Sequence, residues 1–143
     1  MIPKGYQATG LRFILSGKQL CTQFLLGAKW ASTRGWKLRT EDSYRKACAK
    51  GLVVRVQSSW ANHTIIGWAL LRCVSPRGHP RDVVNEETVR EAGCGHMTKD
   101  QYIAEYCMVT NEEGEKTVAE EVVVVYFAEL WTREGRIVVR SIS

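Results

Sequence analysis

Two segments rich in β-branched and apolar residues constrain the fold of this chain most strongly. Leu52–Gln57 and His63–Val74 are separated only by the short polar linker Ser58–Asn62. Two such segments joined in this way are typical of paired antiparallel strands. Gly67 interrupts the second segment, and a glycine inside a strand indicates a bulge or the close approach of another backbone. We therefore predict an antiparallel pair in the middle of the chain.

The first half of the chain predicts two further elements before a helix. Leu11–Leu15 is a short apolar run that stops at Gly17, which predicts a helical turn that packs on the core and ends at the glycine. Gln19–Leu26 is then expected to form a strand. Glu41–Ala49 has apolar residues at helical spacing, so we predict a helix there, capped by Thr40.

The second half carries two clear helix start signals. Asn85 precedes Glu86–Ala92, whose first turn is acidic and which is followed by glycine, as expected of a short capped helix. Thr98 and Gln101 have the spacing of a capping box, in which each residue bonds to the backbone of the other. We therefore predict two short helices in succession.

The remaining segments complete the fold class. Val122–Phe127 is a near-continuous apolar run, typical of a strand buried on both faces, and a final strand is expected at Arg136–Arg140. Parallel βαβ units are not evident, so we predict an α+β domain around a small, partly closed sheet. A length of 143 residues suits one domain, so residues 1–143 are expected to form a single unit. An OB-fold is another small barrel that these strands could form.

Composition excludes several classes of protein. No apolar run is long enough to cross a bilayer, and the N-terminus lacks a signal-peptide core, so we expect no membrane association. The five cysteines are odd in number and form no C-x-x-C, which favours reduced thiols in a cytoplasm. Cys94, His96 and Cys107 supply only one close pair, whereas zinc needs four ligands. We expect neither a metal nor a cofactor.

Charge is divided along the chain. Residues 1–80 carry 13 Lys or Arg against 2 acids, a sum of +11, and residues 81–143 carry 7 against 13, a sum of −6. A basic half of this density suits a polyanion, because Lys and Arg neutralise phosphates and release counterions. The alternative is that the two charge types simply solvate different faces of the protein.

Tryptophans and cations alternate within the basic half. The segment Trp30–Arg39 places two tryptophans beside three cations, as in loops that stack on unpaired bases and contact phosphates. The alternative is that the tryptophans are core residues flanked by surface cations. The candidate nucleic-acid-binding residues are Lys18, Lys29, Trp30, Arg34, Trp36, Lys37 and Arg39.

Three residues are candidates for catalysis. Lys18 follows Gly17 at the expected junction of a helical turn and a strand, and Thr22 would face the same side of that strand. Glu91 ends a short helix, where burial could raise its pKa and make it a general acid or base. The alternatives are a solvent-exposed lysine, a strand threonine and an acid on a solvated helix.

Four segments, in order, resemble an ASCH domain of the PUA-like superfamily. Ile14–Thr22 resembles the opening I-L-x-G-x-K-T-x-T segment, and Ile65–Leu71 is similar to a strand that begins I-x-G. Glu87–Tyr106 resembles an acidic helix that runs into glycine, and Val123–Glu129 is similar to the strand that closes the sheet. The resemblance spans most of the chain, from about residue 6 to residue 130.

This resemblance implies a small PUA-like β-barrel with flanking short helices and a cleft with a basic rim. The family is associated with RNA or modified nucleosides. Some relatives hydrolyse N4-acylated cytidine with a lysine, a threonine and a glutamate, here matched to Lys18, Thr22 and Glu91, and others resemble ribonucleases. Three hypotheses follow: a module that binds RNA, single-stranded DNA or a modified nucleoside; a hydrolase; and an interaction module for an acidic protein partner.

Overall fold

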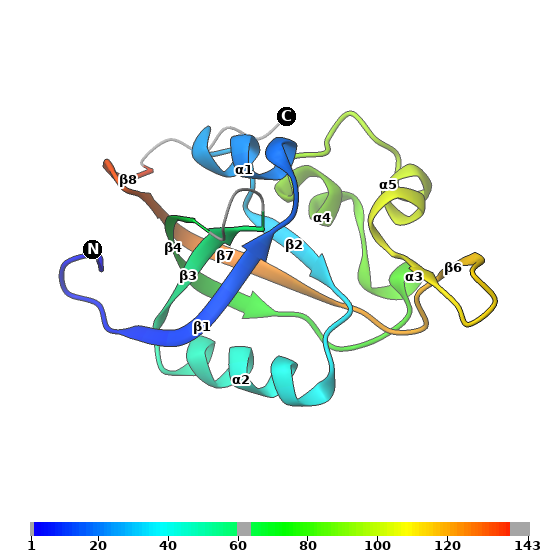
Figure 1. The fold of residues 1–143 in the computed structure, drawn as a ribbon, viewed down its shortest axis with the longest axis horizontal. Coiled ribbons are helices and arrows are strands. Elements are labelled where there is room, and N and C mark those ends of the chain that lie inside the picture. The colour runs from blue at the N-terminus through cyan, green and yellow to red at the C-terminus, as the bar shows by residue number, and fades with distance from the viewer. Residues whose placement is uncertain (1, 60–63, 138–143) are drawn as a thin grey trace.

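A mixed sheet curled into a half-barrel, with short helices around it, forms the centre of the protein (Figure 1). The computed structural model describes residues 2–59 and 64–137. The strands of the main sheet lie in the order β1, β3, β4, β7, β2, and β8 pairs with β7. The elements are β1 (Ala8–Leu15), α1 (Lys18–Leu25), β2 (Ala31–Arg34), α2 (Leu38–Ala49), β3 (Val53–Ser58), β4 (Ile65–Val74), α3 (Pro80–Val83), α4 (Glu86–Glu91), α5 (Lys99–Tyr106), β5 (Met108–Thr110), β6 (Lys116–Val118), β7 (Val123–Thr132) and β8 (Gly135–Arg136). The predicted α+β class is confirmed.

The predicted antiparallel pair in the middle of the chain is confirmed. Strands β3 and β4 pair from Val53 and Leu70 to Gln57 and Ile65, with a register shift next to the pairing of Val56 with Gly67. A side chain at Gly67 would overlap the backbone carbonyl of Trp131 on β7. The glycine is therefore required by the close approach of a neighbouring strand, as expected.

The first two predicted elements are wrong, because their types are exchanged. Leu11–Leu15 belongs to strand β1, where Phe13 and Leu15 are buried on one face in the two-residue period of a strand. The segment predicted as a strand is helix α1, which buries Cys21 and Phe24, three positions apart. The positive φ of Gly17 lies between them, so the glycine ends the strand rather than a helix.

Strand β1 also forms a parallel pair, which the sequence did not indicate. It pairs with β3 from Ala8 and Val53 to Leu15 and Ser58, and the chain passes through α1, β2 and α2 between them. Helix α2 is confirmed as a helix but begins at Leu38, with Lys37 in the N-cap position. The predicted Thr40 cap is therefore wrong: Thr40 lies inside the first turn.

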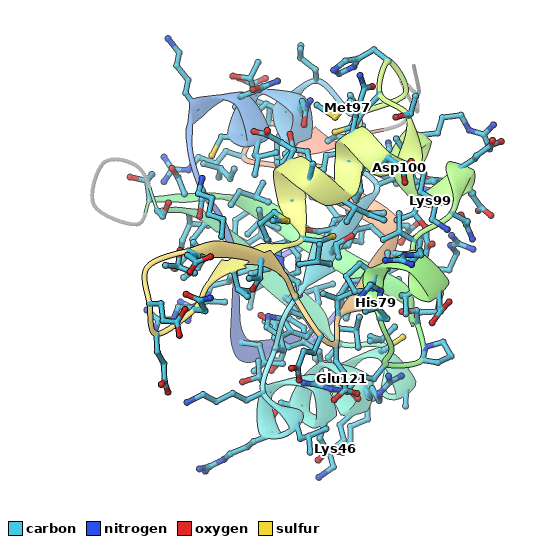
Figure 2. All side chains as sticks on the ribbon, turned by 90° about the vertical axis from the view of Figure 1, so that its right-hand side faces the viewer. Lys46, His79, Met97, Lys99, Asp100 and Glu121 are labelled. Atoms are coloured by element: carbon cyan, nitrogen blue, oxygen red, sulfur yellow. The ribbon has the colours of Figure 1, made fainter. Side chains whose placement is uncertain are left out.

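Both capped helices of the second half are confirmed. Asn85 and Thr88 form the capping box of α4, and Thr98 and Gln101 form that of α5. Figure 2 looks at the molecule from the side of α5 and shows Met97 and Lys99 near the start of this helix. Of the predicted final strand Arg136–Arg140, only Arg136 is in a strand, β8, and Ile137 is not; residues 138–140 lie outside the described residues, as do Trp60 and His63.

Strand β7 separates two hydrophobic clusters, which confirms that it is buried on both faces. Val125 and Phe127 pack into the larger cluster, with residues of β1, α1 and α2. Val124 and Tyr126 point into the second cluster, which includes residues of α4 and α5. Because successive side chains of β7 point to opposite faces of the sheet, the helices of both clusters pack against this one strand. Helices α4 and α5 are thereby held beside the short edge strand β2.

Candidate functional site

A pocket of about 190 Å³ lies at the open seam of the half-barrel. Its wall comes from the end of β1, the beginning of α1, the strand β2 and the helix α5. We call it the seam pocket. Its polar lining residues include Ser16, Lys29, Ser32, Thr33, Arg34 and Tyr102.

Lys29 is a buried cation in this wall, with 4% of its surface exposed. Its Nζ donates to the carbonyl oxygen of Ala31 at 3.1 Å and to that of Ala92 at 3.5 Å. Burial, together with the positive charge of Arg34, lowers the pKa of Lys29 to about 8, and Cys94 opposes this effect slightly. Near neutral pH the Lys29 side chain is thus mostly an ammonium ion, although burial makes this charge unfavourable.

Arg34 spans the seam between the two edge strands. Its Nη2 donates to the carbonyl oxygen of Ile14 on β1 at 2.8 Å, and its Nε donates to Ser32 Oγ at 3.1 Å. The guanidinium carbon lies 4.0 Å from the centre of the Phe13 ring. Burial lowers the pKa of Arg34 to about 10, so this side chain stays charged at neutral pH.

Two tyrosines of α5 form the aromatic wall. Tyr102 shares a hydrogen bond of 2.9 Å with Thr33 Oγ1, and its ring centre lies 5.0 Å from that of Tyr106. Burial raises the pKa of Tyr102, and it raises the pKa of Tyr106 to about 12. Both phenols are therefore neutral at physiological pH and offer hydroxyl groups and ring faces.

The pocket thus concentrates positive charge without a balancing acid. Within residues 2–59 and 64–137, no carboxylate lines it and none forms an ion pair with Lys29 or Arg34. A buried cation such as Lys29 beside a half-buried one such as Arg34 is unfavourable unless an opposite charge joins them. This arrangement favours an anionic ligand or one rich in hydrogen-bond acceptors.

The structure brings some of the predicted binding residues together and separates others. Lys29 and Arg34 meet in the seam pocket. Trp30 is instead a core residue whose Nε1 donates to the carbonyl oxygen of Gly27, and Trp36 stacks on Tyr44 with ring centres 4.1 Å apart. Neither indole lines the pocket. The remaining predicted cations, all exposed, are Lys18, Lys37 and Arg39.

The predicted catalytic residues do not line this pocket. Lys18 and Thr22 are exposed on α1, where the Thr22 hydroxyl donates to the Lys18 carbonyl at 2.8 Å, an ordinary contact within a helix. Glu91 is buried at the end of α4, and its carbonyl oxygen accepts the backbone N–H of Trp30. The strand that would have aligned Lys18 with Thr22 is a helix.

A different alignment of the ASCH pattern with the sequence includes residues of the pocket. The I-L-x-G-x-K-T-x-T pattern can also be aligned with Phe24–Ser32, where Gly27 and Lys29 match the glycine and lysine, Ser32 replaces the last threonine, and Phe24 and Trp30 depart from the pattern. Arg34 then stands where an arginine follows the segment. Five further lining residues carry no signal that led to their prediction, and this register identifies only the serine among them: Ser32, Thr33, Cys94, Tyr102 and Tyr106.

A larger cavity of about 630 Å³ lies between the N-terminal segment and the turn from β7 to β8. Trp68 and Trp131 are among its apolar lining residues, and its charged lining residues are exposed. Arg136, one of them, is paired with Glu129 at 2.8 Å. Because buried, unpaired charge marks a functional site more strongly than volume does, the smaller seam pocket is the better candidate.

Comparisons with known proteins give a likeness of fold. No protein-family model matches the chain, and no curated protein matches its sequence. The solved structure of ASCH from Zymomonas mobilis matches with a TM-score of 0.45 and 14% identity over 82% of this chain and 66% of that chain. A single-residue variant of that protein gives 0.47 and 15%, over 82% of this chain and 67% of that chain. The expected resemblance to ASCH domains is thus found among solved structures, and this chain spans about two thirds of their length.

Proposed function

We propose that this chain binds single-stranded nucleic acid and takes one nucleotide into the seam pocket. The observation that carries the proposal is a buried cation, Lys29, beside a half-buried one, Arg34, in one pocket without an acid among its described lining residues. Phosphate and base carbonyl oxygens are the acceptors that such a pair would hold. The fold keeps both cations in place through carbonyl groups of the backbone.

The size and lining of the pocket support entry of the base or the phosphate group of one unpaired nucleotide. Its volume of about 190 Å³ is below the roughly 300–1,000 Å³ of pockets for drug-sized ligands, so the rest of the nucleotide would stay outside, and a duplex could not enter it. The hydroxyl groups of Thr33 and Tyr102 can bond to the edge of a base. Tyr106 is half-buried in the same wall and offers a ring on which a base can stack.

Exposed cations lie near the place where a nucleic-acid strand would leave the pocket. Lys18 lies two residues after Ser16, and Lys37 lies two residues after Gly35, and both Ser16 and Gly35 line the pocket. Two residues span at most about 7 Å of chain, so each lysine starts close to the mouth. These side chains can follow the phosphates on either side of the bound nucleotide.

Binding of an oligonucleotide should weaken steeply as salt rises. For a single strand, the slope of log affinity against log salt is about 0.7 for each phosphate contact, so Lys37→Ala should lower the slope by about 0.7. We expect Lys37→Ala to bind a single-stranded RNA or DNA oligonucleotide a few-fold more weakly. Fluorescence anisotropy over a salt series measures both quantities.

Lys46→Ala is the matched control for this experiment. Lys46 is an exposed helical lysine on α2, paired with Asp42, and lies at the opposite end of the molecule from α1 in Figure 2. Its removal should leave affinity and slope unchanged. Affinity that ignores salt would contradict the proposal. Retention of an acidic protein, with no oligonucleotide bound, would favour the interaction-module hypothesis instead.

A second candidate is a hydrolase, and the pKa of Lys29 favours it. With a pKa of about 8, Lys29 holds a usable fraction of neutral amine near neutral pH, as a base or nucleophile requires. Ser32 lines the same pocket and carries a hydroxyl group. In this hypothesis Lys29 takes the part first assigned to Lys18. Incubation with an N4-acylated cytidine and with RNA would test it, and turnover that persists in Lys29→Met would reject it.

A further inference from the structure

We propose that the seam pocket recognises a phosphate monoester, so that its ligand is the phosphorylated end of a single strand or a free mononucleotide. The interior of a strand would then bind more weakly. This inference rests on the proposed function, because it names the part of the nucleic acid that enters the pocket. Three features of the described residues carry it. They are the positive charge of the pocket, the N–H groups of Lys29 and Arg34 that have no acceptor, and the lack of a carboxylate among the described lining residues.

The charges match a monoester better than a diester. Lys29 and Arg34 bring two positive charges into a buried wall, and no carboxylate among the described residues lines the pocket or pairs with them. A phosphate monoester carries about −1.5 to −2 charges near neutral pH. An internal phosphodiester carries only one, which would leave a buried positive charge uncompensated.

The hydrogen-bond donors lead to the same conclusion. Lysine has three N–H donors and arginine has five. In the described part of the chain, two donors of Lys29 reach Ala31 and Ala92, and two of Arg34 reach Ser32 and Ile14. The contact to Ala92 is already long, at 3.5 Å. About four donors therefore remain for a ligand, enough for the three terminal oxygens of a monoester.

A dianion in the pocket would also hold a proton on Lys29. The groups that act on Lys29 are Arg34, which lowers its pKa, and Cys94, which raises it slightly. Tyr102 and Tyr106 from α5 are neutral in the same range. A bound phosphate raises the pKa of Lys29, so binding at pH 8–9 should take up a proton and binding at pH 6 should not.

The test compares single strands of one sequence with a 5′-phosphate, with a 3′-phosphate and with neither. An unphosphorylated strand one nucleotide longer controls for added charge. Uridine monophosphate and inorganic phosphate separate the two sources of a monoester. We expect at least one phosphorylated end to bind about 10-fold or more tightly than the unphosphorylated strands. In Lys29→Met this advantage should fall below about 3-fold, whereas Lys46→Ala should keep it.

The outcomes distinguish this inference from the proposed function. Equal binding of phosphorylated and unphosphorylated strands would overturn the inference and leave single-strand binding standing. No binding of any strand or nucleotide would overturn both. A mononucleotide that binds as tightly as the strand supports the inference and identifies the free nucleotide as the ligand. Calorimetry in buffers of different ionisation enthalpy measures proton uptake on the wild type, so the inference stays testable if Lys29→Met does not fold.

Discussion

Lys29→Met should bind single-stranded oligonucleotides about 100-fold more weakly than the wild type and yet be slightly more stable. The loss of affinity follows from removing one of the two cations that face the ligand, because a hydrogen bond to a charged group contributes about 1.5–3 kcal/mol. A factor of ten in affinity corresponds to about 1.4 kcal/mol. Methionine has a similar length and fills the same buried space without charge.

The gain in stability follows from the buried charge. Folding lowers the pKa of Lys29 from an ordinary 10.5 to about 8, and each pKa unit corresponds to about 1.4 kcal/mol, so the buried ammonium costs roughly 3 kcal/mol. Methionine also loses the hydrogen bonds to Ala31 and Ala92, at about 1 kcal/mol each. The expected net gain at pH 7 is roughly 1 kcal/mol in the free energy of unfolding. Function at the expense of stability is common at binding sites.

The same residue sets a pH dependence whose sign can be stated. Below pH 8, Lys29 is protonated in both the folded and the unfolded chain, and the full penalty acts on the folded state. Between about pH 8 and 10.5 the unfolded chain binds more protons, so the wild type becomes more stable as pH rises. Lys29→Met lacks this change. The wild type should regain roughly 2 kcal/mol between pH 7 and pH 9.5, so the advantage of the variant should be present at pH 7 and reversed by pH 9.5.

Urea unfolding of both proteins at pH 7 and pH 9.5, with binding by anisotropy, measures these effects. Lys46→Met is the matched control, because Lys46 is exposed on α2 and removing it should alter neither binding nor the pH dependence. Unchanged binding in Lys29→Met would reject the seam pocket as the nucleotide site. A large loss of stability at pH 7 would show that Lys29 is held for structural reasons instead.

The accuracy of the sequence predictions depends on how local their signals are. The predicted cap at Asn85 and the predicted capping box of Thr98 and Gln101 each depend on only a few neighbouring residues, and both helices form where expected. The apolar run in β7 is long enough to predict a strand buried on both faces. Leu11–Leu15 and Gln19–Leu26 are short apolar runs, which fit either a helix or a strand, and their types were exchanged. The parallel pairing of β1 with β3 joins distant segments and has no local signal.

The candidate site was predictable only in part, for a similar reason. Lys29 and Arg34 were identified because cations are visible in composition and charge, and the structure places both in the pocket. Tyr102 and Tyr106 could not be assigned to the same site from the sequence. They lie about seventy residues after β2, and the packing of α5 brings them to it. The burial of Trp30 is decided by tertiary contacts, so its sequence context could not exclude a stacking role.

Gly67→Ala should destabilise the fold by roughly 3 kcal/mol, near the upper end of the effects of overpacking. An added Cβ would overlap the backbone carbonyl oxygen of Trp131 on β7 and lie 2.8 Å from the Phe24 ring of α1. A backbone oxygen cannot move aside as a flexible side chain can, so β4 and β7 must separate where Gly67 pairs with Thr132. For a chain of this length, we expect the melting temperature to fall by roughly 10 °C.

Gly10→Ala provides the matched control, because Gly10 also lies in a strand, β1, and nothing lies within 4 Å of an added Cβ there. Its φ is not in the left-handed region, so alanine is tolerated, and the variant should match the wild type or gain up to about 1 kcal/mol through a less flexible unfolded chain. Urea and thermal unfolding of both variants measure the difference. If Gly67→Ala and Gly10→Ala were equally stable, the close approach of β7 to β4 at Gly67 would not be a feature of the folded protein. Because Phe24 belongs to the helix that follows Ser16 in the pocket wall, a real clash should also weaken oligonucleotide binding, in Gly67→Ala and not in Gly10→Ala.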